Sequence, residues 1–123
     1  MNHYTNLNSL IDSCDIKVCI VGLGYVGLPL AIEFGNKITT IGFDINNKRL
    51  NDLRQGIDIT LEIEKEDLLK VDNLFFTSNP DDLKEADIYI ITVPTPINTQ
   101  NKPDLSPLIK ATEMIGSVIS EGN

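Results

Sequence analysis

The chain has 123 residues, 41% of them hydrophobic, which is enough for one domain with a packed core. Its 18 acidic residues outweigh its 10 basic residues, and the net charge of −8 disfavours nucleic acid and anionic membrane surfaces as partners. The sequence contains neither an apolar run long enough to span a membrane nor the apolar core of a secretion signal, so we expect a cytoplasmic protein.

Strands and helices alternate along the predicted chain. Residues 1–15 are rich in Asn, Ser and Asp, and we interpret them as an N-terminal arm. The elements expected after this arm are, in chain order, a strand at 16–22, a helix at 25–35, a strand at 38–44, a helix at 47–55, a short helix at 64–70, a strand at 74–77, a short helix at 79–86, a strand at 87–93 and a final helix between 105 and 119.

Local signals support several of these boundaries. Gly56 is a stop for the helix at 47–55, in which Leu50 and Leu53 point inward. Asn79 is the expected cap of the next short helix, and Pro80 occupies its first position. The final helix follows a proline-rich loop, and its apolar residues at helical spacing are Leu105, Leu108, Ile109, Met114 or Ile115, and Ile119.

The alternation predicts the fold class. Continuous apolar runs such as 87–93 are typical of strands that are buried on both faces of a parallel sheet. We therefore predict an α/β fold with a Rossmann-like, doubly wound parallel sheet, right-handed crossovers and the strand order 3-2-1-4. The sequence stops where a fifth strand would begin. We expect residues 16–123 to be one dinucleotide-binding domain, incomplete before strand five and belonging to a longer enzyme.

The segment after the first strand contains the most informative motif. Gly22, Gly24 and Gly27 form a G-x-G-x-x-G pattern between a strand and a helix. The first glycine allows a sharp turn, the second lets the backbone approach a pyrophosphate, and the third lets the helix pack closely on the strand. The amino end of the helix then offers unpaired N–H groups to a diphosphate.

An acidic residue at the expected distance completes the pattern. Asp44 ends the second apolar run, 20 residues after Gly24, where an acid binds the ribose hydroxyl groups of a dinucleotide. A carboxylate at this position also repels a 2′-phosphate, so the sequence favours NAD over NADP. The alternative is that Asp44 caps the following helix, although Asn46 and Asn47 can also fill that role.

A second loop is predicted to meet the glycine turn. In the expected topology, the carboxyl ends of strands one and four lie at the ligand site. Thr95 and the backbone of Val93 are therefore candidate contacts for the nicotinamide half of the dinucleotide. The alternative for Pro94 and Pro96 is a stiff exit from the strand.

The sequence offers no candidates for metal binding or nucleophilic catalysis. Cys19 falls inside the first strand, where we expect it to be buried, and Cys14 precedes that strand. The single histidine, His3, lies in the polar N-terminal segment. We therefore expect no disulfide framework, no metal site and no nucleophile–base pair.

Three segments carry a resemblance to a known family. Residues 21–31 (VGLGYVGLPLA), 42–46 (GFDIN) with Arg49, and 91–97 (ITVPTPI) resemble the N-terminal domain of the UDP-glucose/GDP-mannose dehydrogenase family. The Tyr25–Val26 pair inside the glycine loop is more specific than the glycines. The third segment, continuing through NKPDLSPL, is similar to the UDP-N-acetylhexosamine 6-dehydrogenases of polysaccharide synthesis, the Vi-antigen type included.

The resemblance implies an NAD-dependent oxidation of the C6 hydroxymethyl group of a UDP-sugar to a carboxylate, through a covalent intermediate on a cysteine. It places the catalytic cysteine, the catalytic lysine and the sugar-binding segment beyond residue 123, so we expect this chain alone to be inactive. Arg49 has an alternative role as a solvated helix residue. The cofactor-binding positions that the resemblance implies are Gly24, Tyr25 and Val26 at the diphosphate, Asp44 and Arg49 at the adenosine ribose, and Thr95 near the nicotinamide.

Two other functions remain open from the sequence: a non-catalytic NAD-sensing module, and another NAD-dependent dehydrogenase acting on hydroxyacids. The exposed edge of the fourth strand leads us to expect self-association into a homo-oligomer.

Overall fold

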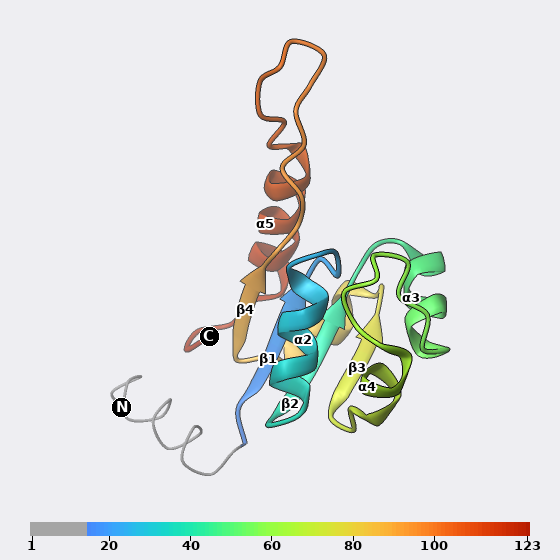
Figure 1. Ribbon diagram of the computed structural model, residues 1–123. Helices are drawn as coiled ribbons and strands as arrows, with labels where there is room; N and C mark the ends of the chain where they lie inside the picture. The colour runs from blue at the N-terminus through green and yellow to red at the C-terminus, as the bar shows by residue number, and fades with distance from the viewer. Residues whose placement is uncertain (1–14) are drawn as a thin grey trace.

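The computed structural model describes residues 15–123, which form a four-stranded parallel sheet with the order β3-β2-β1-β4 (Figure 1). This confirms the predicted fold class and strand order. The predicted arm falls, except for residue 15, outside the described residues, as do Cys14 and His3. The strands are β1 (Lys17–Val21), β2 (Thr39–Phe43), β3 (Leu74–Thr77) and β4 (Ile88–Ile91).

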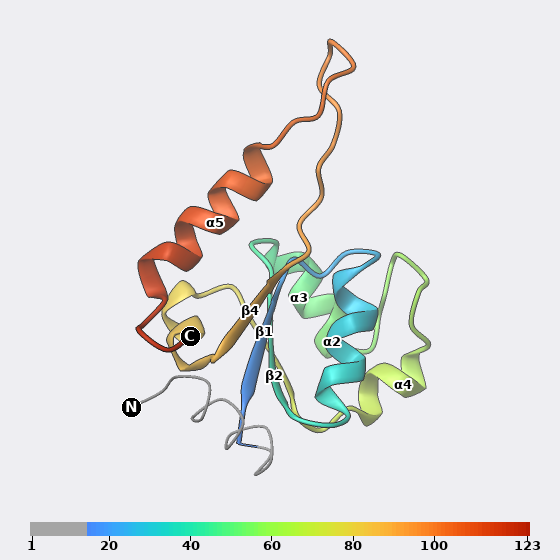
Figure 2. The same ribbon diagram turned by 90° about the vertical axis from the view of Figure 1, so that its left-hand side faces the viewer.

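Helices cover both faces of the sheet, as Figure 2 shows with the sheet nearly edge-on. One face is covered by α2, α3 and α4, and the other by η1 and α5. None of these helices is long and apolar enough to cross a membrane. Their bounds are α2 (Gly27–Gly35), α3 (Asn47–Arg54), α4 (Lys65–Lys70), the 3-10 helix η1 (Pro80–Glu85) and α5 (Ser106–Val118).

The central strand β1 contributes to both hydrophobic cores. Val18 and Ile20 belong to the core beneath α2 and α3, whereas Cys19 and Val21 belong to the core beneath η1 and α5. Successive side chains of a strand point to opposite faces, so a central strand in a three-layer fold needs an uninterrupted apolar run. Each of these four side chains is at most 1% exposed. Full burial of a Val or Ile side chain contributes roughly 1.5–3 kcal/mol to folding.

Most of the predicted helices are present, with one difference of type. Leu50 and Leu53 point into the core, and Gly56 follows α3 with a φ of 80°. Asn79 caps η1 by accepting a hydrogen bond of 3.1 Å from the amide of Asp81, as expected. However, η1 is a 3-10 helix. At six residues it is a short connector of the kind in which 3-10 geometry is common.

The apolar stripe predicted for the final helix is only partly correct. Ala111, Ile115 and Val118 form the buried face of α5, whereas Leu105, Ile109 and Ile119 are about half exposed. Figure 2 gives the reason for Leu105 and Ile109, because the first half of α5 projects beyond the carboxyl end of the sheet, whereas Ile119 follows the last residue of α5.

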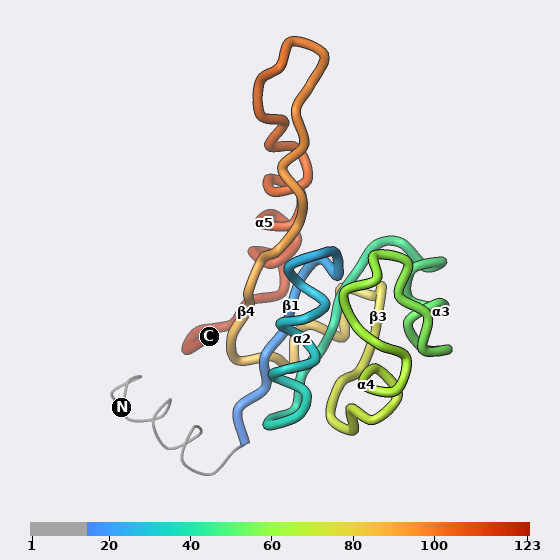
Figure 3. The backbone as a smooth tube through the Cα atoms, viewed as in Figure 1, coloured from blue at the N-terminus to red at the C-terminus, as the bar shows by residue number. Residues whose placement is uncertain are grey.

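Residues 94–105 form an arm that extends away from the body of the domain (Figure 3). Its two sides meet in an antiparallel bridge between Ile97 and Pro103, and the amide of Asn98 donates to the carbonyl of Lys102 at 2.8 Å. The Asn98 side chain accepts hydrogen bonds from the amides of Gln100 and Lys102 and so closes the tip. The segment predicted as a loop is therefore a hairpin-like arm.

Candidate functional site

The glycine turn connects the end of β1 to the start of α2. Gly22 has a φ of 100°, a conformation that L-residues with side chains rarely adopt, and its amide donates to the carbonyl of Phe43 at 2.8 Å. At Gly27, a Cβ atom would lie 1.8 Å from the carbonyl oxygen of Gly22, so no side chain fits. At Gly24, by contrast, a Cβ atom would meet nothing within 4 Å. The fold therefore requires glycine at positions 22 and 27 but leaves position 24 facing open space.

Thr92, which the sequence analysis did not single out, supports this turn. Its hydroxyl group donates to the carbonyl oxygen of Gly22 at 2.7 Å from the end of β4. The interaction joins the two loops that were predicted to meet at the ligand site. The one feature of the sequence that could have indicated a role for Thr92 is its position just before Val93, because ligands bind at the carboxyl ends of strands in such sheets.

Asp44 is tied to the glycine turn. Its Oδ2 atom accepts a hydrogen bond of 3.0 Å from the amide of Leu23, and its Oδ1 atom accepts one of 2.9 Å from the amide of Asn46. The alternative that Asp44 caps α3 is wrong, because Asn46 is the cap and accepts from the amide of Arg49 at 3.1 Å. A carboxylate can accept about four hydrogen bonds, so Asp44 keeps acceptor capacity for a ligand.

Arg49 is a buried part of the site. It is 7% exposed, so the alternative of a solvated helix residue is wrong. Its Nε atom donates to the carbonyl oxygen of Leu23 at 2.9 Å, and its Nη1 atom donates to Oδ1 of Asp58 at 2.7 Å. The guanidinium group therefore links α3 both to the glycine turn and to the segment after α3.

Asp58 is the partner that the sequence analysis missed. Its side chain is fully buried, and it accepts hydrogen bonds from the amides of Thr60, Glu62 and Ile63 and from the Thr60 hydroxyl group. Burial alone raises the pKa of Asp58, but the hydrogen bonds from Thr60, Arg49 and Ile63 outweigh it and bring the pKa to about 2. In the sequence, Asp58 is marked only by its position between two isoleucines, Ile57 and Ile59.

A cavity of about 540 Å³ opens at the carboxyl ends of β1 and β2. Five of the predicted site residues line it. Tyr25, Val26, Gly27 and Thr95 are not among its lining residues, and the contacts predicted for them stay predictions. The cavity is lined by Val21, Gly22, Leu23, Gly24, Phe43, Asp44, Ile45, Asn46, Arg49, Val93, Pro94, Pro107, Lys110, Ala111 and Met114.

The wall opposite the glycine turn comes from α5. Pro107, Lys110, Ala111 and Met114 line this side of the cavity. A site role for these residues could not be predicted from the sequence, because the angle at which α5 crosses the sheet depends on tertiary packing. This wall is apolar at Pro107, Ala111 and Met114 and carries one charged side chain, Lys110.

The polar groups of the cavity fit a dinucleotide. The Nη2 atom of Arg49 is a buried donor with no hydrogen-bond partner among the described residues, so an acceptor on a ligand would satisfy it. Among the described residues, no side chain caps the amino end of α2 at Val26, next to the lining residues of the glycine turn, which leaves backbone donors for a phosphate. The open space at Gly24 allows close approach of the backbone to a ligand. A diphosphate near α2 and a ribose near Asp44 match these groups.

Metal-ligating side chains and cysteine thiols are two further kinds of group that can support chemistry. Within residues 15–123, no group of three or more His, Cys, Asp or Glu side chains is arranged to hold a metal ion. Cys19 is buried as expected, and burial raises the pKa of its thiol to about 12. Cys19 is therefore a packing residue whose buried environment disfavours the reactive thiolate.

Comparison with known proteins identifies the family. The sequence profile of the UDP-glucose/GDP-mannose dehydrogenase family, NAD binding domain, matches residues 16–123. The chain is 55% identical over 109 residues to a UDP-N-acetyl-D-glucosamine 6-dehydrogenase from Pseudomonas aeruginosa, covering 89% of this chain and 26% of that protein. It is 52% identical to a protein of the same name from Salmonella typhi, with the same coverage.

A solved structure shares the fold. The UDP-D-ManNAc dehydrogenase from Pyrococcus horikoshii matches with a TM-score of 0.74 and 30% identity, over 87% of this chain and 27% of that one. The chain thus spans about a quarter of the length of the curated relatives it matches. From its sequence, its fold and the matched profile, the chain belongs to the UDP-glucose/GDP-mannose dehydrogenase family and carries its NAD-binding domain, whose cofactor is NAD.

Proposed function

We propose that residues 16–123 form the cofactor-binding domain of a nucleotide-sugar 6-dehydrogenase, with NAD bound in the cavity described above. The observation that carries this proposal is the convergence of an open glycine position, Gly24, with the Asp44 carboxylate and the buried, unpartnered Arg49 donor on one cavity. Gly22 and Gly27 shape the turn, and Val93 contributes backbone to the nicotinamide side. Tyr25, Val26 and Thr95 do not line the cavity, and their contacts with the cofactor are part of the proposal.

The bound NAD would supply the hydride acceptor, and the residues of this chain would bind and orient it. The Asp44 carboxylate accepts hydrogen bonds from the adenosine ribose, while the Arg49 guanidinium group donates to the ribose from the other side. The amino end of α2 stabilises the diphosphate. The apolar wall that includes Ala111 and Met114 excludes water from the adenine side.

The proposed substrate of the whole enzyme is a UDP-sugar, such as UDP-N-acetylglucosamine, UDP-N-acetylgalactosamine or UDP-glucose, oxidised at C6 to the uronate. Relatives at 52–55% identity named for UDP-N-acetyl-D-glucosamine support this class. They also favour a dehydrogenase over the NAD-sensing module and over a hydroxyacid dehydrogenase.

The 123-residue chain by itself is proposed to bind NAD without turnover. Cys19, the cysteine among the described residues, is buried with a pKa of about 12 and lies in the core away from the cavity lining. A family mechanism through a cysteine would need a thiol from elsewhere in the enzyme. The proposed location is the cytoplasm, where a free thiol such as Cys19 persists.

Self-association is proposed through the outer edge of β4. In the described sheet β4 pairs with β1 on one side, and its other side carries no strand. Unpaired edges are templates for pairing with another chain. Light scattering should give a mass that rises with concentration, and a strictly monomeric mass at high concentration would contradict this proposal.

The proposed function is tested by titration calorimetry of the chain with NAD, followed by incubation with NAD and UDP-N-acetylglucosamine. We expect saturable binding of one NAD and no NADH absorbance. Absence of NAD binding would refute the site, whereas clear turnover would refute the proposed inactivity of this chain.

A further inference from the structure

Arg49 poses a question about cofactor choice. In Rossmann folds, an arginine beside the adenosine ribose is the group that accommodates the 2′-phosphate of NADP. Arg49 lines the same cavity as Asp44, and its Nη2 atom is buried without a hydrogen-bond partner in the described part of the chain. Taken alone, this cation would weaken the preference for NAD that Asp44 provides.

Asp58 lies directly behind this cation. Its Oδ1 atom is 2.7 Å from Nη1 of Arg49, and the side-chain exposures of the two residues are 0% and 7%. A buried pair at this distance leaves little net charge. Asp44 and Lys110 also line the cavity, so with Asp58 the site holds two positive and two negative charges, and without Asp58 its balance would be positive.

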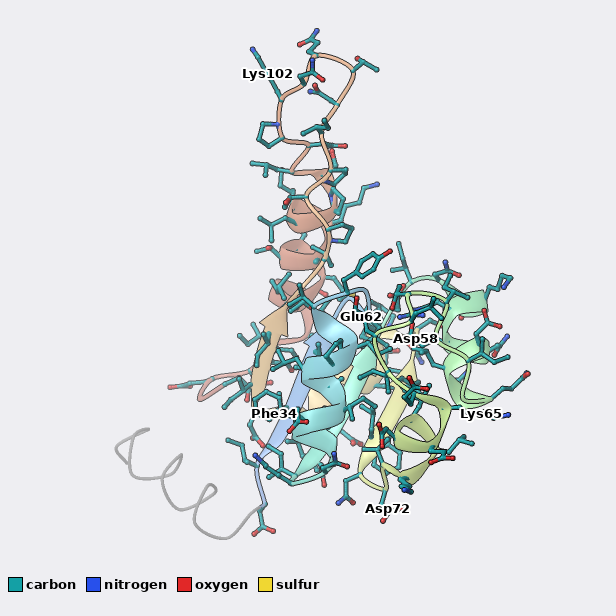
Figure 4. The ribbon with its side chains drawn as sticks, in the orientation of Figure 1. Phe34, Asp58, Glu62, Lys65, Asp72 and Lys102 are labelled. Carbon is teal, nitrogen blue, oxygen red and sulfur yellow. The ribbon has the colours of Figure 1, made fainter. Side chains whose placement is uncertain are left out.

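The carboxylate of Asp58 is fixed in place as well as ionised. It accepts from the Thr60 hydroxyl group at 2.6 Å and from the amides of Thr60, Glu62 and Ile63 at 2.9–3.1 Å. These donors come from the same short segment, so Asp58 organises that segment around itself (Figure 4). The position of the carboxylate then determines the position of the guanidinium group.

The guanidinium group of Arg49 is in turn held in one orientation by the hydrogen bonds of two of its nitrogen atoms. Nε is bonded to the carbonyl oxygen of Leu23 and Nη1 to Asp58, which leaves Nη2 as the remaining group. Because the guanidinium is planar and rigid, fixing Nε and Nη1 also fixes the direction of Nη2.

We propose that Asp58 is a specificity-determining positioning residue: it fixes the direction of Nη2 of Arg49 and cancels the arginine's charge beside the cavity, so that the site accepts the free ribose of NAD and rejects the 2′-phosphate of NADP. This inference rests on the proposed NAD site. Asp58 itself lines no part of the cavity and acts through Arg49.

The test measures the dissociation constants of NAD and NADP for the full chain and for the Asp58→Asn variant by calorimetry. Asp72→Asn is the matched control, because it removes the same charge from an exposed position at the opposite end of the sheet (Figure 4). The wild-type chain and the control should both prefer NAD. In Asp58→Asn, we expect the preference for NAD over NADP to fall by about tenfold, as for a unit charge removed at roughly 10 Å from the phosphate.

Each outcome is decisive. Equal weakening of NAD and NADP in Asp58→Asn would mean that Asp58 is only structural and would overturn the inference, while leaving the NAD site intact. Failure of the wild-type chain to bind NAD would instead refute the proposed function and the inference with it.

If Asp58→Asn does not fold, as judged by circular dichroism, the wild-type chain provides the second measurement. NMR of the Arg49 guanidinium group, assigned by comparison with Arg49→Lys, should show separate Nη1 and Nη2 signals and a shift of Nη2 when NAD is added. A single averaged signal, or an Nη2 signal that NAD leaves unchanged, would overturn the inference.

Discussion

The α-carbon of Gly27 lies so close to the carbonyl group of Gly22 that a Cβ atom at position 27 would be 1.8 Å from the Gly22 oxygen. A Cβ atom at Gly24, between them, would have no neighbouring atom within 4 Å among the described residues. The motif therefore combines two glycines that the fold requires with one that the fold does not require. These roles can be separated by experiment.

The first prediction concerns Gly24. Gly24→Ala should leave the thermal unfolding midpoint nearly unchanged, because the new methyl group meets no protein atom. It should weaken NAD binding by more than tenfold, because the methyl group occupies the space through which a pyrophosphate approaches. Gly116→Ala, in α5 and also without neighbours within 4 Å, is the control and should bind NAD normally. Normal NAD affinity in Gly24→Ala would remove this turn from the site.

The second prediction concerns Gly27. Gly27→Ala should destabilise the domain by several kcal/mol, because the new Cβ atom would overlap the carbonyl oxygen of Gly22 and the backbone must move to separate them. Urea denaturation should show a midpoint far below that of Gly24→Ala. Equal stability of the two variants would mean that the turn is more adaptable than its geometry indicates.

The third prediction concerns Asp44. A hydrogen bond to a charged group contributes about 1.5–3 kcal/mol, so Asp44→Ala should weaken NAD binding by roughly 10- to 150-fold. Asp44 also accepts from the amide of Leu23, so the variant should be less stable than the wild type as well. Binding is therefore measured by calorimetry at a temperature where circular dichroism shows the variant to be folded. Unchanged affinity would exclude Asp44 as a ligand contact.

The fourth prediction concerns pH. The pKa of Asp58 is about 2 in the folded protein against 3.8 for the unperturbed group, so the unfolded chain takes up the proton first as pH falls. The stabilisation of about 2 kcal/mol is therefore complete above pH 4 and is lost between about pH 4 and pH 2. Thermal unfolding over this range should show a shallower fall for Asp58→Asn than for the wild type. Parallel curves would contradict the depressed pKa.

The fifth prediction concerns Cys19. Because burial raises the pKa of its thiol to about 12, iodoacetamide should not modify Cys19 in the native chain at mildly alkaline pH. Modification should appear once denaturant is added, and peptide mass spectrometry assigns it to the residue. Rapid labelling of native Cys19 would show that β1 opens readily.

The parts of the site that could be predicted from the sequence are encoded over short distances. Gly22, Gly24, Gly27 and Asp44 follow a spacing that one strand–turn–helix–strand unit fixes, and the strand order followed from the alternation of elements. The capping residue Asn79 and the stop at Gly56 were also local signals, and the structure contains both.

The parts that could not be predicted depend on packing between distant segments. Thr92 reaches Gly22 across 70 residues, and Asp58 gains its role only when α3 brings Arg49 beside it. The exposed side chains of Leu105 and Ile109 illustrate the same point, since helical periodicity cannot show how much of α5 extends past the sheet. The family resemblance implied a site role for Arg49, but its burial could not be predicted, because charged residues on helices are usually exposed.

One guanidinium group joins the turn at Leu23, the helix at Arg49 and the segment around Asp58. Such a three-way junction restricts the motion of these segments before any cofactor arrives. A preorganised pocket loses little conformational freedom when it is filled, so more of each contact's free energy appears as affinity. Through the same junction, a substitution near residue 58 can reach the glycine turn at Leu23.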